Sequence, residues 1–168
     1  MSTRRVDPDR RERIIDCVLE LVAVQGMAGT SHRKVAALAD VPLGSMTYHF
    51  SGMDELLEAT FTRFARGVGE RFAARHAGEL AGAKLVSALV ELIHDDVLES
   101  HRSLALTMEL YTLTARNPRF RDITQGWLEI SARALERHMD AATAQQVDAL
   151  IEGLSIHRAL GTTPPSRS

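Results

Sequence analysis

Residues 30–50 read TSHRKVAALADVPLGSMTYHF, and the order of helix formers and helix breakers in this stretch decides the fold. Thr30 and Ser31 offer hydroxyl groups that can cap a short helix reaching to about residue 39. That helix must then stop, because the residue before Pro42 avoids helical backbone angles, while Pro42 can open a new helix over about residues 42–49. Two short helices joined by a tight turn are typical of a helix-turn-helix.

The first short helix and the turn after it give two further expectations. Val35, Ala36 and Leu38 are expected to face the core, since they are the apolar side chains of that helix. Asp40 is expected to occupy the turn at modest cost, because Asp tolerates a left-handed backbone better than most residues other than glycine.

Helices are also expected on both sides of this stretch. Asp7 and Pro8 are expected to begin the preceding helix, as N-cap and first helical residue, and Gly26 to end it. Both flanking helices carry apolar stripes at helical spacing. The stripes are Ile14, Cys17, Val18, Leu21 and Val22 before the stretch, and Leu57, Phe61, Phe64, Val68 and Phe72 after Ser51-Gly52.

The rest of the chain repeats the helical period. Further helices are expected at about residues 79–98, 101–115, 122–140 and 143–159, and alternating β-branched runs are absent. The sequence therefore predicts an all-α fold with an N-terminal three-helix helix-turn-helix domain and a helical-bundle domain after it. The expected boundaries are 1–50 for the first domain, 51–160 for the second and 161–168 for a flexible tail.

Composition and charge limit the class of protein. The 168 residues are 45% hydrophobic and 25% charged, which is ordinary for a soluble globular protein. No apolar run approaches the roughly 20 residues of a membrane span, and the N-terminus lacks a secretory signal, so a cytoplasmic location is expected. Cys17, the single cysteine, rules out an internal disulfide and is expected to be a small buried apolar residue.

The first fifty residues are slightly basic although the whole chain has a formal charge of −2. Five arginines gather in and before the first helix, and either they form a solvated arm or they bind phosphate; charge alone leaves both open. These are Arg4, Arg5, Arg10, Arg11 and Arg13.

Taken together, residues 10–57 resemble the tetracycline-repressor-like (TetR) family of bacterial transcription regulators. The resemblance rests on the first helix RERIIDCVLELVAVQG, on the pairs Thr30-Ser31, Val35-Ala36 and Gly44-Ser45, on Ala39 and Val41, on Tyr48-His49-Phe50, and on Asp54-Glu55-Leu56-Leu57. Beyond residue 57 only the length and the succession of helices agree. The resemblance implies a helical effector-binding and dimerisation domain behind a DNA-binding head.

The resemblance implies that the helix at about 42–49 enters the major groove. Gly44 would allow a close approach to the duplex, and Ser45 and Thr47 could bond base edges, whereas Phe50 is expected in the core. For each candidate the alternative is a surface side chain without a partner, and His32 and His49 stay open between the two. The expected DNA-binding residues are Thr30, Ser31, Arg33, Lys34, Leu43, Gly44, Ser45, Thr47, Tyr48 and His49.

The chain departs from many relatives at positions that often contact DNA. It has Pro42 and Leu43 where they have a polar cap and a lysine, Thr47 where they have tyrosine, and Met53 where they have lysine. Because phosphate contacts drive salt-dependent affinity, the N-terminal arginines are expected to carry a larger share, as an arm on phosphate or in the minor groove.

The resemblance also implies a symmetric dimer and an effector pocket, although packing within each chain's own core is the alternative for both residue sets. The expected dimer residues are Ile123, Trp127, Ile130, Ala134, His138, Val147, Leu150, Ile151, Leu154 and Arg158. The expected effector-binding residues are Phe64, Phe72, His94, Met108, Tyr111, Phe120 and Trp127. This mostly apolar set favours an apolar or aromatic small molecule.

Other classes of function have weaker support. His94, Asp95, Asp96 and His101 lie close in sequence, but helix ends gather such residues by chance, so neither a metal nor a cofactor is expected. No motif places a catalytic nucleophile, base or phosphate-binding loop, so an enzyme is not expected.

The sequence is therefore interpreted as a dimeric repressor that binds a palindromic operator, lies on the nucleoid when bound, and is released by a small molecule. An activator of the same family and a helical protein-interaction module are the alternatives. Relatives often carry one more helix after a segment like Gly161–Pro165, so part of the interface could lie beyond this chain.

Overall fold

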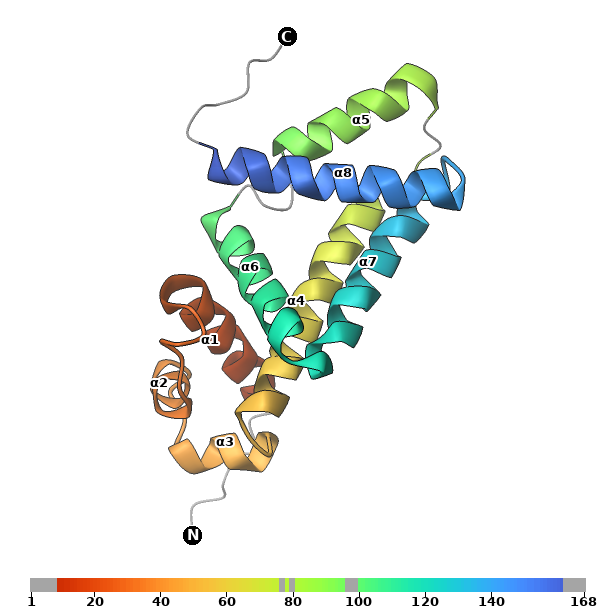
Figure 1. Ribbon diagram of the computed structural model, residues 1–168. Helices are drawn as coiled ribbons and strands as arrows, with labels where there is room; N and C mark the ends of the chain where they lie inside the picture. Colours follow the sequence, from red (N-terminus) through yellow and green to blue (C-terminus); the bar gives the residue numbers. More distant parts are fainter. Residues whose placement is uncertain (1–8, 76–77, 79–80, 96–99, 162–168) are drawn as a thin grey trace. The chain divides into compact units, whose positions relative to one another are not determined.

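The computed structural model describes residues 9–75, 78, 81–95 and 100–161, and in these ranges the regular structure is entirely helical (Figure 1). The all-α prediction is confirmed. The helices are α1 (Arg10–Gln25), α2 (His32–Leu38), α3 (Leu43–His49), α4 (Met53–Arg75), α5 (Gly82–Asp95), α6 (His101–Arg116), the 3-10 turn η1 (Pro118–Phe120), α7 (Arg121–Leu135) and α8 (Ala141–Leu160). Across the described residues, no helix is both long enough and apolar enough to cross a bilayer.

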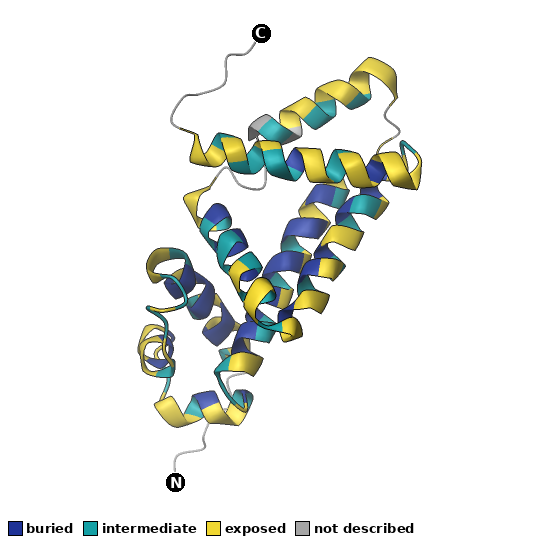
Figure 2. Ribbon diagram, in the orientation of Figure 1, coloured by how far each residue is buried: buried dark blue, intermediate teal, exposed yellow. Residues whose placement is uncertain are grey.

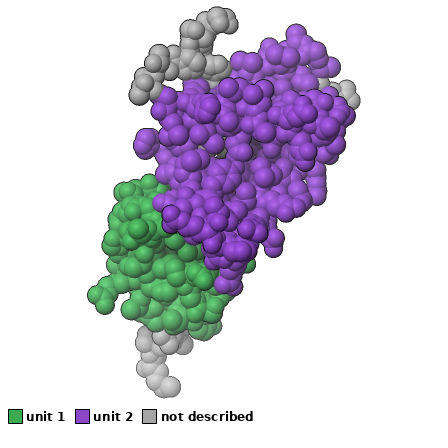
Figure 3. Space-filling model, viewed as in Figure 1, with its two compact units in different colours: residues 1–62 green, residues 63–168 purple. Residues whose placement is uncertain are grey.

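The chain divides into two compact units, residues 1–62 and residues 63–168, which we call the head and the C-terminal unit (Figure 3). The division falls inside α4, later than the boundary expected after residue 50. The reason is that Leu56, Leu57 and Phe61 are buried side chains of the first turns of α4.

The head is held together by one apolar core. Its members come from all four helices and include Ile14, Val18, Val22, Val35, Ala36, Met46, Phe50, Leu57 and Phe61, each almost fully buried. The expected burial of Phe50 is confirmed, and so is the stripe on α1 except at Cys17. Cys17 is only partly buried, and this burial raises the pKa of its thiol.

The start of α1 differs from the expectation. The first helical hydrogen bond runs from the Arg13 amide to the Asp9 carbonyl (2.9 Å), so Asp9 occupies the cap position that was expected for Asp7. Asp7, Pro8, Arg4 and Arg5 lie outside the described residues. The helix ends before Gly26 as expected, with a positive φ of 68° at that glycine.

The helix-turn-helix follows the expected pattern with one correction. The Ser31 side chain caps α2 by accepting from the Lys34 amide (3.4 Å), and Asp40 adopts the left-handed turn with φ of 52°. Pro42 stands just before α3 rather than in its first turn. The inward placement of Leu38 was wrong: the side chain is 51% exposed, because a helix of seven residues has one short inner face, which Val35, Ala36 and Ala39 fill.

The C-terminal unit is a bundle in which α8 packs against α5, α6 and α7 (Figure 1). Phe64, Val68 and Phe72 form the buried stripe of α4, as expected. At Gly69 an added Cβ would lie 2.9 Å from the Ile130 side chain, so this glycine allows α4 and α7 to approach closely.

Several helix ends differ from the sequence prediction by a few residues. α8 begins at Ala141 because the Asp140 carboxylate accepts from the amides of Ala142 and Thr143, at 3.1 Å each. These bonds, together with the Thr143 hydroxyl, lower the pKa of Asp140. The turn η1 was not predicted, and the Asn117 side chain caps it by accepting from the Arg119 amide (3.1 Å).

Candidate nucleic-acid interface and effector pocket

The ten side chains expected to contact DNA all belong to the head, and none of them is buried. On α3 only Met46 is buried; Ser45 and His49 are intermediate, and the other four residues are exposed (Figure 2). Tyr48 is 84% exposed, an unusual position for an aromatic ring in a folded domain. The helix is thus presented as a surface rather than packed as core.

The polar groups at the start of α2 are hydrogen-bonded to nearby residues. The Thr30 hydroxyl donates to the Gly26 carbonyl (3.0 Å), and the Lys34 ammonium donates to the Gln25 side chain and the Gly29 carbonyl (2.7 Å each). Arg33 is exposed. A phosphate placed here would therefore meet positioned hydroxyl groups and one exposed guanidinium.

Two side-chain contacts are made within α3 itself. The Thr47 hydroxyl donates to the Gly44 carbonyl (3.0 Å), and the rings of Tyr48 and His49 meet edge to face with centroids 5.0 Å apart. A Cβ added at Gly44 would meet no atom within 4 Å, so the fold itself does not require glycine there.

Two of the five N-terminal arginines act inside the head. The Arg11 guanidinium lies 5.2 Å from the centroid of the Phe50 ring, and Arg13 Nε donates to the carbonyl of Ala39 at the end of α2 (3.0 Å). These contacts hold the helix-turn-helix against α1. An arm contact to DNA would have to come from the other arginines, of which Arg4 and Arg5 lie outside the described residues.

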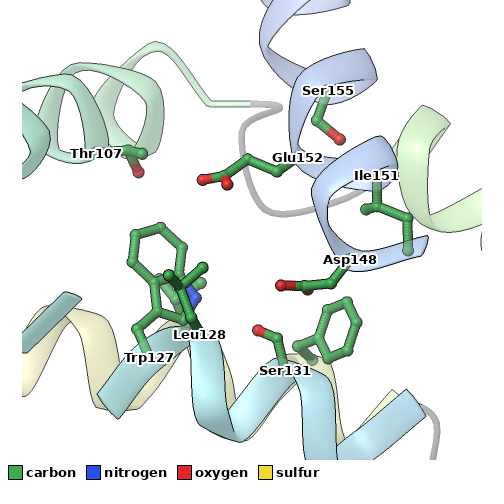
Figure 4. Close-up of a pocket in the computed structure, with 10 residues that line it drawn as sticks. Thr107, Trp127, Leu128, Ser131, Asp148, Ile151, Glu152 and Ser155 are labelled. Carbon is green, nitrogen blue, oxygen red and sulfur yellow. The ribbon is translucent and has the colours of Figure 1, made fainter. Parts of the chain in front are cut away.

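The C-terminal unit contains a pocket between α4, α6, α7 and α8 with about 520 Å³ of empty space, part of it open to solvent (Figure 4). The lining residues are Val68, Phe72, Thr107, Trp127, Leu128, Ser131, Asp148, Ile151, Glu152 and Ser155.

Phe72 and Trp127 of the expected effector set line this pocket, and two more support its wall. The Tyr111 ring stacks on Trp127 with centroids 6.1 Å apart, and Phe64 meets Trp127 edge on at 6.2 Å. The Tyr111 hydroxyl also donates to the Glu152 carboxylate.

The remaining expected effector residues are placed elsewhere. Phe120 is buried in η1, and Met108 is partly buried on α6; neither is among the lining residues. The side chains of His94 and Asp95, and the whole of Asp96, lie outside the described residues, so the arrangement weighed as a metal site cannot be followed there.

Sequence reasoning missed the polar lining of the pocket, above all Asp148 and Glu152. These two acids are four residues apart on α8, which puts them on one helix face. Burial raises the pKa of Asp148 to about 6, and burial also raises the pKa of Glu152. Their spacing beside buried Ile151 was the one signal in the sequence that could have pointed to them.

The residues expected at a dimer interface fall into three groups. Trp127, Ala134 and Ile151 are buried within the C-terminal unit, and Arg158 donates to the Ile93 carbonyl of α5 (3.0 Å). Leu150 and Leu154 of α8 are 59% and 41% exposed. The others, Ile123, Ile130, His138 and Val147, are partly exposed.

Comparison with known proteins agrees with this geometry. The family profile of bacterial regulatory proteins, tetR family, matches residues 14–60, which span α1 to the first turns of α4. The crystal structure of SCO1917, a TetR family member from Streptomyces coelicolor A3, is 36% identical with a TM-score of 0.76, covering 95% of this chain and 92% of that one. This chain belongs to the TetR family. It is a transcriptional regulator that binds DNA through its helix-turn-helix.

Two other structures extend the likeness of this TetR-family regulator across both units. SCO7518 of Streptomyces coelicolor A3(2) is 46% identical with a TM-score of 0.89, covering 95% of this chain and 92% of that chain. The multidrug binding protein EbrR, solved with ethidium, is 35% identical with a TM-score of 0.77, covering 94% and 91%. The homologues are transcriptional regulators, a non-enzymatic family.

Proposed function

We propose that this regulator is a homodimeric repressor whose α3 helices read a palindromic operator, and that a small molecule in the C-terminal pocket releases it. The observation that carries the DNA-reading part is the exposure of α3. The helix α3 has seven residues, and Met46 is the only one of them that is buried in the core. The pocket supports the effector part, because the relative EbrR has been solved with ethidium, proflavin and malachite green.

A dimer follows from the small size of α3. One short helix reads only a few base pairs, so a useful operator needs two copies on successive major grooves, about 34–36 Å apart on B-DNA. The exposed pair Leu150 and Leu154 lies on one face of α8 and offers apolar surface for a two-fold contact. Effector binding would then favour a dimer whose two heads no longer match that spacing.

The DNA-reading proposal is tested by selecting bound sequences from a random duplex pool at two salt concentrations. We expect an enriched inverted repeat whose affinity falls as salt rises, since phosphate contacts release counterions. Transcription in vitro from a promoter that carries the selected repeat then separates repression from activation. Binding without any enriched sequence would overturn the proposal and favour the interaction module.

Gly44→Ala separates recognition from folding. Because a Cβ there meets no atom of this chain, we expect unchanged or slightly higher thermal stability, as Ala favours helix by about 1 kcal/mol. Operator affinity should fall by about tenfold, since the methyl group keeps α3 from its closest approach to the duplex. Gly126→Ala on α7 is the matched control, because a Cβ there also meets no atom within 4 Å. Equal operator affinity for both variants would contradict the proposed contact.

The dimer is tested by Leu150→Glu combined with Leu154→Glu. Charges on this face should shift the protein from dimer to monomer in analytical ultracentrifugation and weaken operator binding together with it. Val86→Glu on α5 is the control, because Val86 is 60% exposed and outside the proposed face. A double variant that stays dimeric would move the interface away from Leu150 and Leu154.

A further inference from the structure

The polar groups of the pocket are all acidic or neutral. α8 contributes the carboxylates of Asp148 and Glu152, and the other polar lining residues are the hydroxyl-bearing Thr107, Ser131 and Ser155. None of the ten lining residues is Lys, Arg or His. Figure 4 shows both carboxylates projecting from α8 toward the space in front of Trp127 and Thr107. The pocket therefore presents negative charge, with no cation among the described residues that line it.

A buried hydroxyl group in the same wall lacks a bonding partner. Thr107 is fully buried, and its Oγ1 makes no hydrogen bond within the part of the chain that the structure describes. Buried polar atoms are nearly always paired, and the exceptions in native proteins often mark a site that a ligand or water completes. Thr107 lines the pocket, so the missing partner would come from what the pocket binds.

The two carboxylates are poorly compensated by the protein. Glu152 accepts one hydrogen bond from the Tyr111 hydroxyl, whereas the pKa of Asp148 is raised to about 6 by lost hydration alone. Asp148 and Glu152 lie four residues apart on one face of α8. A positive charge between them would offset the lost hydration of both.

The aromatic side chains favour a flat partner that carries such a charge. Trp127 lines the pocket and is fixed by Tyr111, stacked at 6.1 Å with an interplanar angle of 13°, and by the edge of Phe64. Ring faces attract cations, and planar rings stack well on them. The apolar side chains of Val68, Phe72 and Ile151 complete the wall for the rest of such a molecule.

We propose that the effector is a flat organic cation, with its charge between Asp148 and Glu152, its ring system against Trp127 and a polar atom on Thr107. This inference rests on the effector role proposed above for the same pocket. The sequence predicts an apolar or aromatic ligand, and this proposal adds that the ligand carries a positive charge. It therefore excludes anionic effectors.

Two dyes with the same ring system and different charge test the sign. The 168-residue chain is titrated at about pH 8, above the pKa of about 6 of Asp148, with the cation N-methylacridinium and with neutral acridine, and dye fluorescence reports binding. We expect the cation to bind at least about tenfold more tightly, since charge pairing and cation–π contact in a partly dry pocket add to the same stacking.

The double variant Asp148→Asn with Glu152→Gln should lower the affinity for N-methylacridinium by about a hundredfold and leave that for acridine within about twofold, because only the charge pairing is lost. Glu136→Gln, at an exposed acid after α7, should change neither affinity. Circular dichroism checks that the double variant is folded. Equal affinity of the wild type for both dyes, no binding of either, or equal loss of both in the double variant would overturn the cation proposal.

Release of operator DNA separates this inference from the function it rests on. N-methylacridinium should release the wild-type protein from the operator but should not release the double variant. The double variant also serves as the control for dye that binds DNA, because release of this variant would have to come from such binding. Carboxylate-dependent binding without release would overturn the effector role and uphold the cation site. Release by neutral ligands alone would uphold the effector role and overturn the cation site.

Discussion

Thr60 in the head and Thr107 in the C-terminal unit are both fully buried threonines on α-helices, and they differ in how their hydroxyl groups are used. The Thr60 hydroxyl donates to the carbonyl of Leu56, one turn earlier (2.7 Å). The Thr107 hydroxyl has no partner among the described residues. The buried hydroxyl of Thr60 is thus hydrogen-bonded within its own helix, whereas that of Thr107 has no partner among the described residues and lies beside a pocket.

The same contrast holds for the functional surfaces of the two units. In the head, Thr30, Ser31 and Thr47 bond to backbone groups three or four residues away, so the surface proposed for DNA is shaped by local sequence. The pocket instead joins side chains of four helices, from Val68 to Ser155. A DNA-reading surface can be fixed locally because the duplex supplies the rest of the site, whereas a small molecule must be enclosed.

The largest effect is expected at Met46, the only buried residue of α3. Met46→Ala should destabilise the head by about 2–5 kcal/mol, the usual range for removing a large core side chain. Operator binding should fail at a temperature where dye binding in the C-terminal unit persists. Val24→Ala, at a side chain that is 79% exposed, should change the free energy of unfolding by less than about 0.5 kcal/mol.

The two measurements, operator binding and dye binding, are made on the same Met46→Ala sample across a temperature series. Their separation would show that each unit keeps its own core. If both activities were lost at one temperature, folding of the pocket would depend on the head. The two units would then differ only in how their buried polar groups are bonded.

Much of the head could be predicted from sequence because its determinants are local. The cap at Ser31, the left-handed Asp40 and the buried Phe50 all follow from residue type and near neighbours, and all are confirmed. Leu38 was misplaced because two turns of helix do not define an inner face until neighbouring helices pack against it. The N-cap position of α1 is at Asp9 rather than Asp7, and the Asp9 side chain makes no capping hydrogen bond, so residue type alone did not predict where the helix begins.

The pocket could be predicted only in part, because its polar lining depends on which face of α8 packs toward the neighbouring helices. Trp127 and Phe72 were found as large apolar residues on amphipathic helices. Asp148 and Glu152 were missed because two acids four residues apart on a helix usually face solvent. Only the packing of α8 against α6 and α7 shows that this face lines a pocket.

A smaller effect is expected from pH at Asp148. Its pKa is raised from 3.8 to about 6 in the folded protein, so the protonated acid favours folding: the stability is fully present below about pH 4 and is lost as pH rises through about 6. The full shift would correspond to about 3 kcal/mol, and because water still reaches part of the side chain we expect about 1–2 kcal/mol.

Asp148→Asn should remove this loss. Urea unfolding at about pH 4.5 and pH 7.5 should therefore show a smaller decline in the free energy of unfolding for the variant than for the wild type. Part of the decline should remain, since burial also raises the pKa of Glu152. Glu136→Gln controls for the removal of an exposed acid; a decline equal to wild type in Asp148→Asn would mean that water hydrates Asp148 fully.

The smallest effects should have opposite signs at the two threonines. Thr60→Val removes a satisfied hydroxyl and should destabilise the protein by about 0.5–1.5 kcal/mol, whereas Thr107→Val removes an unpaired one and should stabilise it by about 1 kcal/mol. Urea unfolding measures both. Thr107→Val should also weaken binding of proflavin severalfold, because its amino groups can bond the hydroxyl, and should leave binding of N-methylacridinium, which has no hydrogen-bonding atom, unchanged. A stabilised variant that binds both dyes unchanged would show that Thr107 stays unpaired even in the complex, and a destabilised one would mean that a bound water already satisfies it.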